Sequence, residues 1–237
     1  MQTASRYQEV ARRMFVEQLK WSIWFIVIAG VFVRGGLFVM AGSLNVDDVV
    51  TMSLLEFMLD ASKIYMLVIG ILSVYVFMNY LVRNGITRRD YFLSTVISTV
   101  GLAVTFLIIF SLLTIIEMVI INVASINVDI NTLTVMSAAT LNIQFFFALV
   151  LYFSIGWFIT IGFYRYNWMV GLGFILLAIG ATSLTDMIWG QEGMVLFGFQ
   201  FTSGDMTLIL SILSSLILTA ILWGINRRLT RDINIKL

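Results

Sequence analysis

Residues 92–121 read FLSTVISTVGLAVTFLIIFSLLTIIEMVII, and Glu117 carries the only charge in this run. An α-helix rises about 1.5 Å per residue, so about 20 such residues cross the hydrocarbon core of a bilayer. The pattern predicts an all-α integral membrane protein with six transmembrane helices, the third of which is long enough to tilt or protrude. The other five apolar segments are residues 21–40, 64–82, 141–164, 168–184 and 206–225.

The composition agrees with a membrane protein and excludes several kinds of enzyme. Charged residues make up 11% of the 237 residues, against about 25% in soluble domains. The chain has no His, Cys or Pro, so the usual zinc sites, disulfides and His-dependent nucleophiles are excluded. The P-loop motif is also absent. We therefore expect one membrane domain over residues 1–237 that is not an enzyme, with no catalytic residue, metal site or cofactor of its own and no nucleic-acid partner.

The positive charges predict the orientation of the chain in the membrane. If the N-terminus is cytoplasmic, 12 of the 14 Lys and Arg residues lie on the cytoplasmic side, and only Arg34 and Lys63 lie elsewhere. Positive residues are retained on that side, so six spans with both termini in the cytoplasm are predicted. Residues 226–237 then form a basic cytoplasmic tail.

Three segments outside the spans have patterns of their own. Residues 1–20 place apolar and charged side chains on opposite faces, which favours an amphipathic helix on the cytoplasmic membrane surface over a helix packed on a soluble partner. Residues 45–61 resemble an outer amphipathic helix capped by Asn45. Residues 187–203 are apolar and interrupted by glycines, so we expect them to dip into the outer leaflet or lie on it.

The connection between the second and third spans reads RNGITRRDYF over residues 83–92. Gly85 suits the left-handed residue that ends a helix. Thr87 is placed to cap the next helix with Asp90 three residues later, while Ile86 and Tyr91 have the spacing of a hydrophobic staple. The pattern predicts a short, rigid, basic helical elbow, although a well-capped positive anchor explains it equally well.

Residues 85–92, Gly-Ile-Thr-Arg-Arg-Asp-Tyr-Phe, resemble the same connection in small bacterial ABC-transporter permeases of the type-2 exporter superfamily. The arrangement of an amphipathic N-terminal helix, six spans and a basic tail is also similar. The resemblance implies that the elbow is a coupling helix, which seats in a cytoplasmic ATPase. The coupling residues would be Gly85, Ile86, Thr87, Arg88, Arg89, Asp90 and Tyr91, with Arg165 as a second, smaller contact.

Further expectations follow from this resemblance. The chain would be the permease subunit of an ATP-driven exporter in the bacterial cell membrane. It would dimerise with an identical or paralogous permease, and its partner ATPase would bind ATP and Mg. Its substrate would be amphipathic or hydrophobic, such as a peptide or a lipid-like drug. The alternatives are a substrate-capture subunit of a vitamin or metal importer, or a non-transporting scaffold or immunity protein.

Two charges lie inside predicted spans and are candidates for a functional site. A charge in hydrocarbon costs about 2.5 kcal/mol or more unless it is paired or reaches the interface. Arg34 is 13 residues into the first span, and Glu117 is near the outer end of the third. They could pair with each other, or with Asp186 or Asp205; alternatively, each reaches the headgroup region.

Small residues in the fourth and fifth spans predict close helix contacts. They are Gly156 with Thr160, and Gly171, Gly173 and Gly180.

Overall fold

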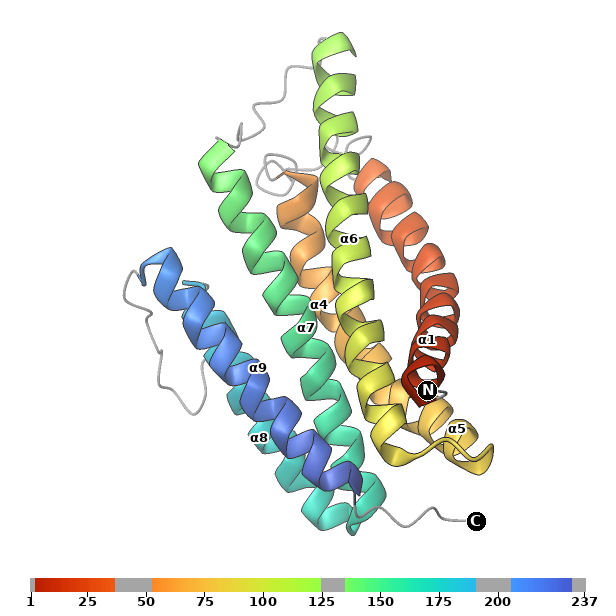
Figure 1. Ribbon diagram of the computed structural model, residues 1–237. Helices are drawn as coiled ribbons and strands as arrows, with labels where there is room; N and C mark the ends of the chain where they lie inside the picture. The colour runs from red at the N-terminus through yellow and green to blue at the C-terminus, as the bar shows by residue number, and fades with distance from the viewer. Residues whose placement is uncertain (1–2, 37–52, 125–134, 191–205, 232–237) are drawn as a thin grey trace.

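Six helices, each long and apolar enough to cross a membrane, make up the described part of the chain (Figure 1). This computed structural model describes residues 3–36, 53–124, 135–190 and 206–231, and no strand occurs among them. Two of the helices contain wider π-helical turns. The bounds are α1 (Thr3–Phe25) with its π-helical extension η1 (Ile26–Val33); α4 (Leu54–Leu72), η2 (Ser73–Met78) and α5 (Asn79–Arg83); α6 (Arg88–Ala124); α7 (Val135–Arg165); α8 (Trp168–Ile188); and α9 (Leu208–Arg231).

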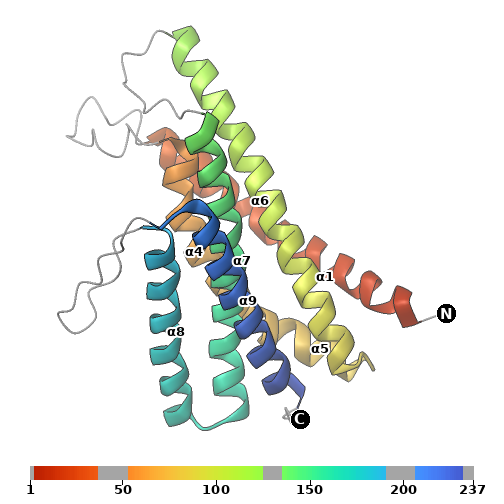
Figure 2. The same cartoon turned by 60° about the vertical axis from the view of Figure 1, so that its left-hand side comes forward.

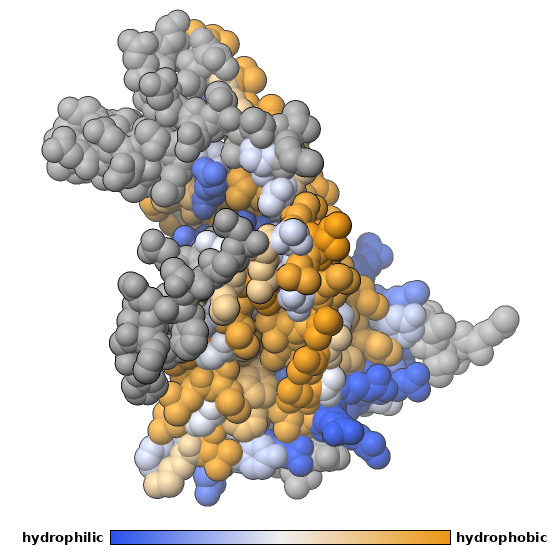
Figure 3. Space-filling model, turned by 90° about the vertical axis from the view of Figure 1, so that its left-hand side faces the viewer, coloured by the Kyte–Doolittle hydropathy of each residue, from blue (hydrophilic) through white to orange (hydrophobic). Residues whose placement is uncertain are grey.

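The prediction of six apolar helices is therefore confirmed, and the chain is a multi-pass membrane protein by the length and composition of its helices. The start of α1, the turn between α5 and α6, the α7–α8 junction and the end of α9 lie at one end of the bundle (Figure 1). We call this the elbow end. Apolar side chains cover the face formed by α8 and α9, whereas hydrophilic side chains gather at the elbow end (Figure 3).

Helix α7 is the centre of the bundle. In its most apolar stretch 83% of the residues are buried, against 17% in α8 and 22% in α9. Helices α4, α6, α8 and α9 pack around α7 (Figure 2), and the side chains of Phe153 and Trp157 are fully buried. The peripheral helices keep apolar faces outward, as expected of helices that contact lipid.

Glycine allows α4 and α7 to approach until their backbones touch. A Cβ added to Gly70 would lie 2.2 Å from the carbonyl oxygen of Phe153, and one added to Gly156 would lie 2.1 Å from that of Leu67. The Thr160 hydroxyl donates to the Ile71 carbonyl at 3.2 Å. The predicted close contact at Gly156 and Thr160 is thus confirmed.

The glycines of α8 give a mixed result. Gly171 packs against the Phe163 ring, where an added Cβ would lie 2.5 Å from a ring atom. The prediction is wrong for Gly173 and Gly180 within the described part of the chain, because an added Cβ there would have no neighbour within 4 Å.

The predicted separation between an N-terminal surface helix and the first span is wrong. The helix continues without a break from residue 3 to residue 36. Its apolar stripe does not face lipid, because Val10, Ala11 and Met14 are buried within the protein. The Ser94 hydroxyl of α6 donates to the Tyr7 carbonyl, and that of Ser98 donates to the Gln18 side chain. These contacts hold α1 obliquely across α6 (Figure 2).

The second span also begins earlier than predicted. Ser53 caps α4 in a capping box, in which its hydroxyl accepts from the Glu56 N–H and the Glu56 carboxylate accepts from the Ser53 N–H. Residues 54–61 are therefore the first turns of the spanning helix and not the end of a separate outer helix. Asn45 lies outside the described residues.

Helix α6 has 37 residues, or about 56 Å of helix. It extends past the described parts of its neighbours at the end opposite the elbow (Figure 1), as expected of the span predicted to tilt or protrude. In the predicted outer segment 187–203, α8 continues to Ile188 and Gly190 adopts a positive φ of 69°. Residues 191–203 lie outside the described residues.

Candidate functional site

The turn between α5 and α6 has both of the predicted helix caps. Gly85 has φ 78°, and its N–H donates to the Val82 carbonyl while the Ile86 N–H donates to the Leu81 carbonyl. This is a Schellman ending, which satisfies the last carbonyls of the helix. The backbone at this connection is therefore fixed by its own hydrogen bonds.

The next helix starts at Thr87. Its hydroxyl accepts from the Asp90 N–H at 3.1 Å and donates to the Asp90 carboxylate at 2.8 Å. The predicted short coupling helix does not form as a separate element, because the helix that Thr87 caps is the third span itself, α6. The elbow is thus a tight turn at residues 84–87 between two long helices.

Tyr91 cannot be part of a contact surface, which corrects its place among the predicted coupling residues. Its side chain is fully buried. The hydroxyl donates to the Ser73 carbonyl at 3.2 Å, and the ring meets that of Trp157 edge to face. Gly85, Thr87 and Arg89 are exposed, whereas Ile86, Arg88 and Asp90 are half-buried.

Two of the predicted coupling arginines meet at the end of α9. Arg88 donates to the Arg231 carbonyl at 2.6 Å, and Arg165 donates to the Leu229 carbonyl at 3.3 Å. The last carbonyls of a helix lack partners within the helix and carry a partial negative charge. Arg88 of α6 and Arg165 of α7 therefore cap α9 and fasten three helices together at the elbow end.

The two predicted intramembrane charges form an ion pair at the opposite end. Arg34 Nε lies 2.9 Å from Glu117 Oε1, and the side chains are 2% and 10% exposed. The other carboxylate oxygen of Glu117 accepts from the Leu54 N–H at 3.0 Å, and the Arg34 guanidinium lies over the Phe57 ring. Glu117 therefore joins α6 to the start of α4 and to the end of the first helix.

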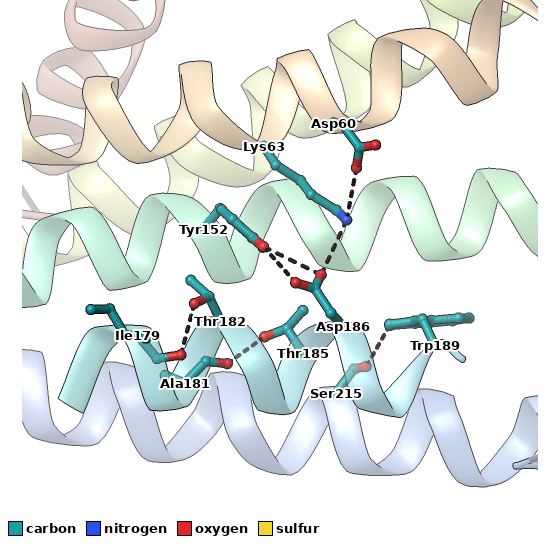
Figure 4. Close-up of polar contacts among 10 residues, drawn as sticks. All are labelled: Asp60, Lys63, Tyr152, Ile179, Ala181, Thr182, Thr185, Asp186, Trp189 and Ser215. Atoms are coloured by element: carbon teal, nitrogen blue, oxygen red, sulfur yellow. Dashed lines mark hydrogen bonds and ion pairs between the residues drawn. The ribbon is translucent and has the colours of Figure 1, made fainter. Parts of the chain in front are cut away.

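A second charged cluster was not predicted from the sequence (Figure 4). The Lys63 ammonium lies 3.1 Å from carboxylate oxygens of both Asp186 and Asp60. The Tyr152 hydroxyl donates to Asp186 at 3.1 Å. The Lys63 side chain is 6% exposed and that of Asp186 is 20% exposed, whereas Asp60 is 78% exposed. This Lys63 cluster joins α4, α7 and α8.

Of the pairing alternatives for Arg34, the structure shows the pair with Glu117 and gives Asp186 other partners. Asp186 binds Lys63 and Tyr152, and Asp205 lies outside the described residues. The signal that could have revealed the Lys63 cluster is the pair of opposite charges at 63 and 186, each within two residues of a predicted span boundary. Charges at such positions need a partner in or near the bilayer.

No protein-family model, curated protein or solved structure matches this chain.

Proposed function

We propose that this chain is the membrane-spanning subunit of an ATP-driven exporter and works with a separate ATPase. The observation that carries the proposal is the doubly capped turn at residues 84–87. The exposed basic side chains of Arg83 and Arg89 flank this turn, whose backbone is held rigid by its own hydrogen bonds. Such a turn transmits a push from a partner into the helices, whereas a flexible loop absorbs it.

The arginine contacts extend that rigid element to other helices. A force on the turn acts directly on α5 and α6. It reaches α9 through the hydrogen bond from Arg88 to Arg231, and Arg165 ties α7 to the same helix end. Closure of an ATPase beneath the turn would therefore shift several helices together and favour one packing of the bundle over another.

The proposed contact surface is smaller than the sequence pattern indicated. It consists of Gly85, Ile86, Thr87 and Arg89, with Arg83 at its edge. Arg88 and Arg165 contribute by positioning α9, and Tyr91 by anchoring α6 in the core. ATP and Mg would be bound by the partner, because the chain contains no P-loop motif.

The remaining parts of the proposal rest on charge and resemblance. The distribution of Lys and Arg supports cytoplasmic termini, and the resemblance of residues 85–92 supports the bacterial cell membrane and an amphipathic or hydrophobic substrate. The pathway would form between two permease copies or paralogues.

The test is purification from native membranes in mild detergent, followed by mass spectrometry of the co-purifying chains. Wild type and Arg228→Glu, a control charge reversal at the elbow end, should retain a subunit with a Walker A motif. Arg89→Glu should lose it. An intact assembly without an ATPase would contradict the proposal and favour the scaffold protein. A separate membrane subunit lying between this chain and the ATPase would favour the importer.

A further inference from the structure

A groove of about 800 Å³ lies at the elbow end between the N-terminal half of α1 and the η2–α5 segment with the turn that follows it. Its apolar floor includes Val16 and Tyr80, which are 40% and 68% exposed, together with the buried side chains of Val10, Met14, Phe77 and Leu81. Its size falls within the range of ligand sites, about 300–1,000 Å³. We propose that this groove binds one anionic phospholipid.

The charge on the rim of the groove favours an anion. The charged residues that line it are Arg6, Arg12, Arg13, Glu9 and Glu17. Arg13 pairs with Glu9, and Glu17 pairs with Lys20. Among the described residues neither Arg6 nor Arg12 has an ion-pair partner, so two positive charges are left for a ligand. Both are exposed and can reach a phosphate.

The aromatic side chains around the groove fit an amphiphile that remains partly in the bilayer. Trp21 packs on Phe77 with ring centroids 5.8 Å apart, and Tyr80, which lines the groove, is 68% exposed. Trp and Tyr side chains favour the interface between headgroups and hydrocarbon. A phospholipid would place its headgroup between Arg6 and Arg12 and its acyl chains over Phe77 and Tyr80.

Basic pockets between membrane helices bind anionic headgroups, and each Lys or Arg adds a similar increment of affinity. A soluble phosphate would use the arginines alone, whereas a phospholipid also uses the apolar floor. The ligand is therefore distinguished from free phosphate by its acyl chains and from neutral lipid by its charge.

The test is native mass spectrometry of the purified protein, titrated with phosphatidylglycerol or phosphatidylcholine of identical acyl chains. Wild type should retain one phosphatidylglycerol in preference to phosphatidylcholine. The double variant Arg6→Gln/Arg12→Gln should weaken that binding about 30-fold at low salt. Neither side chain is buried, so the variant should fold as wild type does. The control Arg228→Gln/Arg231→Gln removes two exposed charges from the same end outside the groove and should bind as wild type does.

Three results would overturn the proposal. The first is equal retention of the two lipids, which would show that the groove does not select an anionic lipid and would favour a protein segment as its occupant. The second is an equal loss in the control variant, which would indicate general attraction to the basic end. The third is displacement of phosphatidylglycerol by millimolar inorganic phosphate, which would identify an anion site without a role for the acyl chains. As a second variant, Val16→Trp, at a 40% exposed position in the groove lining, should reduce lipid binding by filling the groove.

Discussion

The ammonium nitrogen of Lys63 lies 3.1 Å from Oδ1 of Asp186, a residue 123 positions later in the chain. The pair joins α4 to α8, the helix with the smallest share of buried residues in its most apolar stretch. Tyr152 of the central helix α7 donates to the same carboxylate. One carboxylate thus fixes a peripheral helix to two others.

Asp186→Asn should destabilise the protein by about 2 kcal/mol, because it removes the more buried of the two carboxylates that pair with Lys63 without changing the side-chain volume. The free energy of unfolding can be measured by SDS titration of the purified protein. Asp60→Asn is the matched control, since Asp60 is 78% exposed and should contribute less than about 0.5 kcal/mol. Equal effects of the two variants would show that the buried contact to Asp186 does not hold α8.

Arg34 and Glu117 should behave as a coupled pair. Glu117→Gln or Arg34→Met alone removes one member of an ion pair in which both side chains are nearly buried, and each should cost about 2.5 kcal/mol or more. The double variant should cost less than the sum, because neither charge remains. Additive losses in a double-mutant cycle would mean that the two charges do not stabilise each other.

The elbow could be predicted from the sequence because its hydrogen bonds are local. Gly85 and Thr87 cap helices through atoms within five residues of them, so the sequence pattern contains the whole interaction. The Lys63 cluster depends on how three helices pack. Its charged residues lie near predicted span boundaries, where an apolar run ends but the helix continues, whereas Tyr152 lies in the middle of a predicted span.

The same distinction explains the errors at the elbow and in α1. The apolar stripe of residues 7–15 predicts that one face of the helix is covered, but it does not distinguish lipid from another helix. In the structure helix α6 covers this face. Likewise, the sequence predicts a staple at Tyr91 but not the position of Trp157, whose ring meets that of Tyr91 edge to face.

Gly70→Ala and Gly156→Ala should each destabilise the α4–α7 contact by about 1–3 kcal/mol. The added methyl group would meet backbone atoms at 2.2 and 2.1 Å, and a backbone cannot move aside as a flexible side chain can. Gly173→Ala and Gly180→Ala on α8 are controls with the same chemistry and open space around them. They should be neutral or stabilising, because alanine favours helix. Thermal unfolding in detergent compares the four variants, and equal losses in both pairs would contradict close packing at Gly70 and Gly156.

Arg88→Gln should loosen the last turn of α9. The Arg231 carbonyl would lose its cationic donor, a contribution of about 0.3–1 kcal/mol at a helix terminus. Hydrogen exchange of amides 226–231 should therefore become faster, while exchange in the middle of α9 stays unchanged. Arg89→Gln changes the adjacent exposed residue and should leave that exchange as it is. If amides 226–231 exchange at the same rate in both variants, Arg88 does not fasten α6 to α9.

Gly85→Val together with Thr87→Ala tests the elbow directly. Valine disfavours the positive φ of 78° that Gly85 adopts, and alanine removes the hydroxyl that caps α6. The two changes should cost about 1–2 kcal/mol and about 1 kcal/mol, respectively.

The apolar helices should still insert, so the variant should reach the membrane at a normal level. In a reconstituted complex its partner ATPase should hydrolyse ATP with little transport, because a loosened turn moves without shifting α6 and α9. Arg228→Glu, which leaves both caps intact, is the control for this assay. Normal transport per ATP in the double variant would mean that the turn is only an anchor, and the force would have to enter the bundle at another contact.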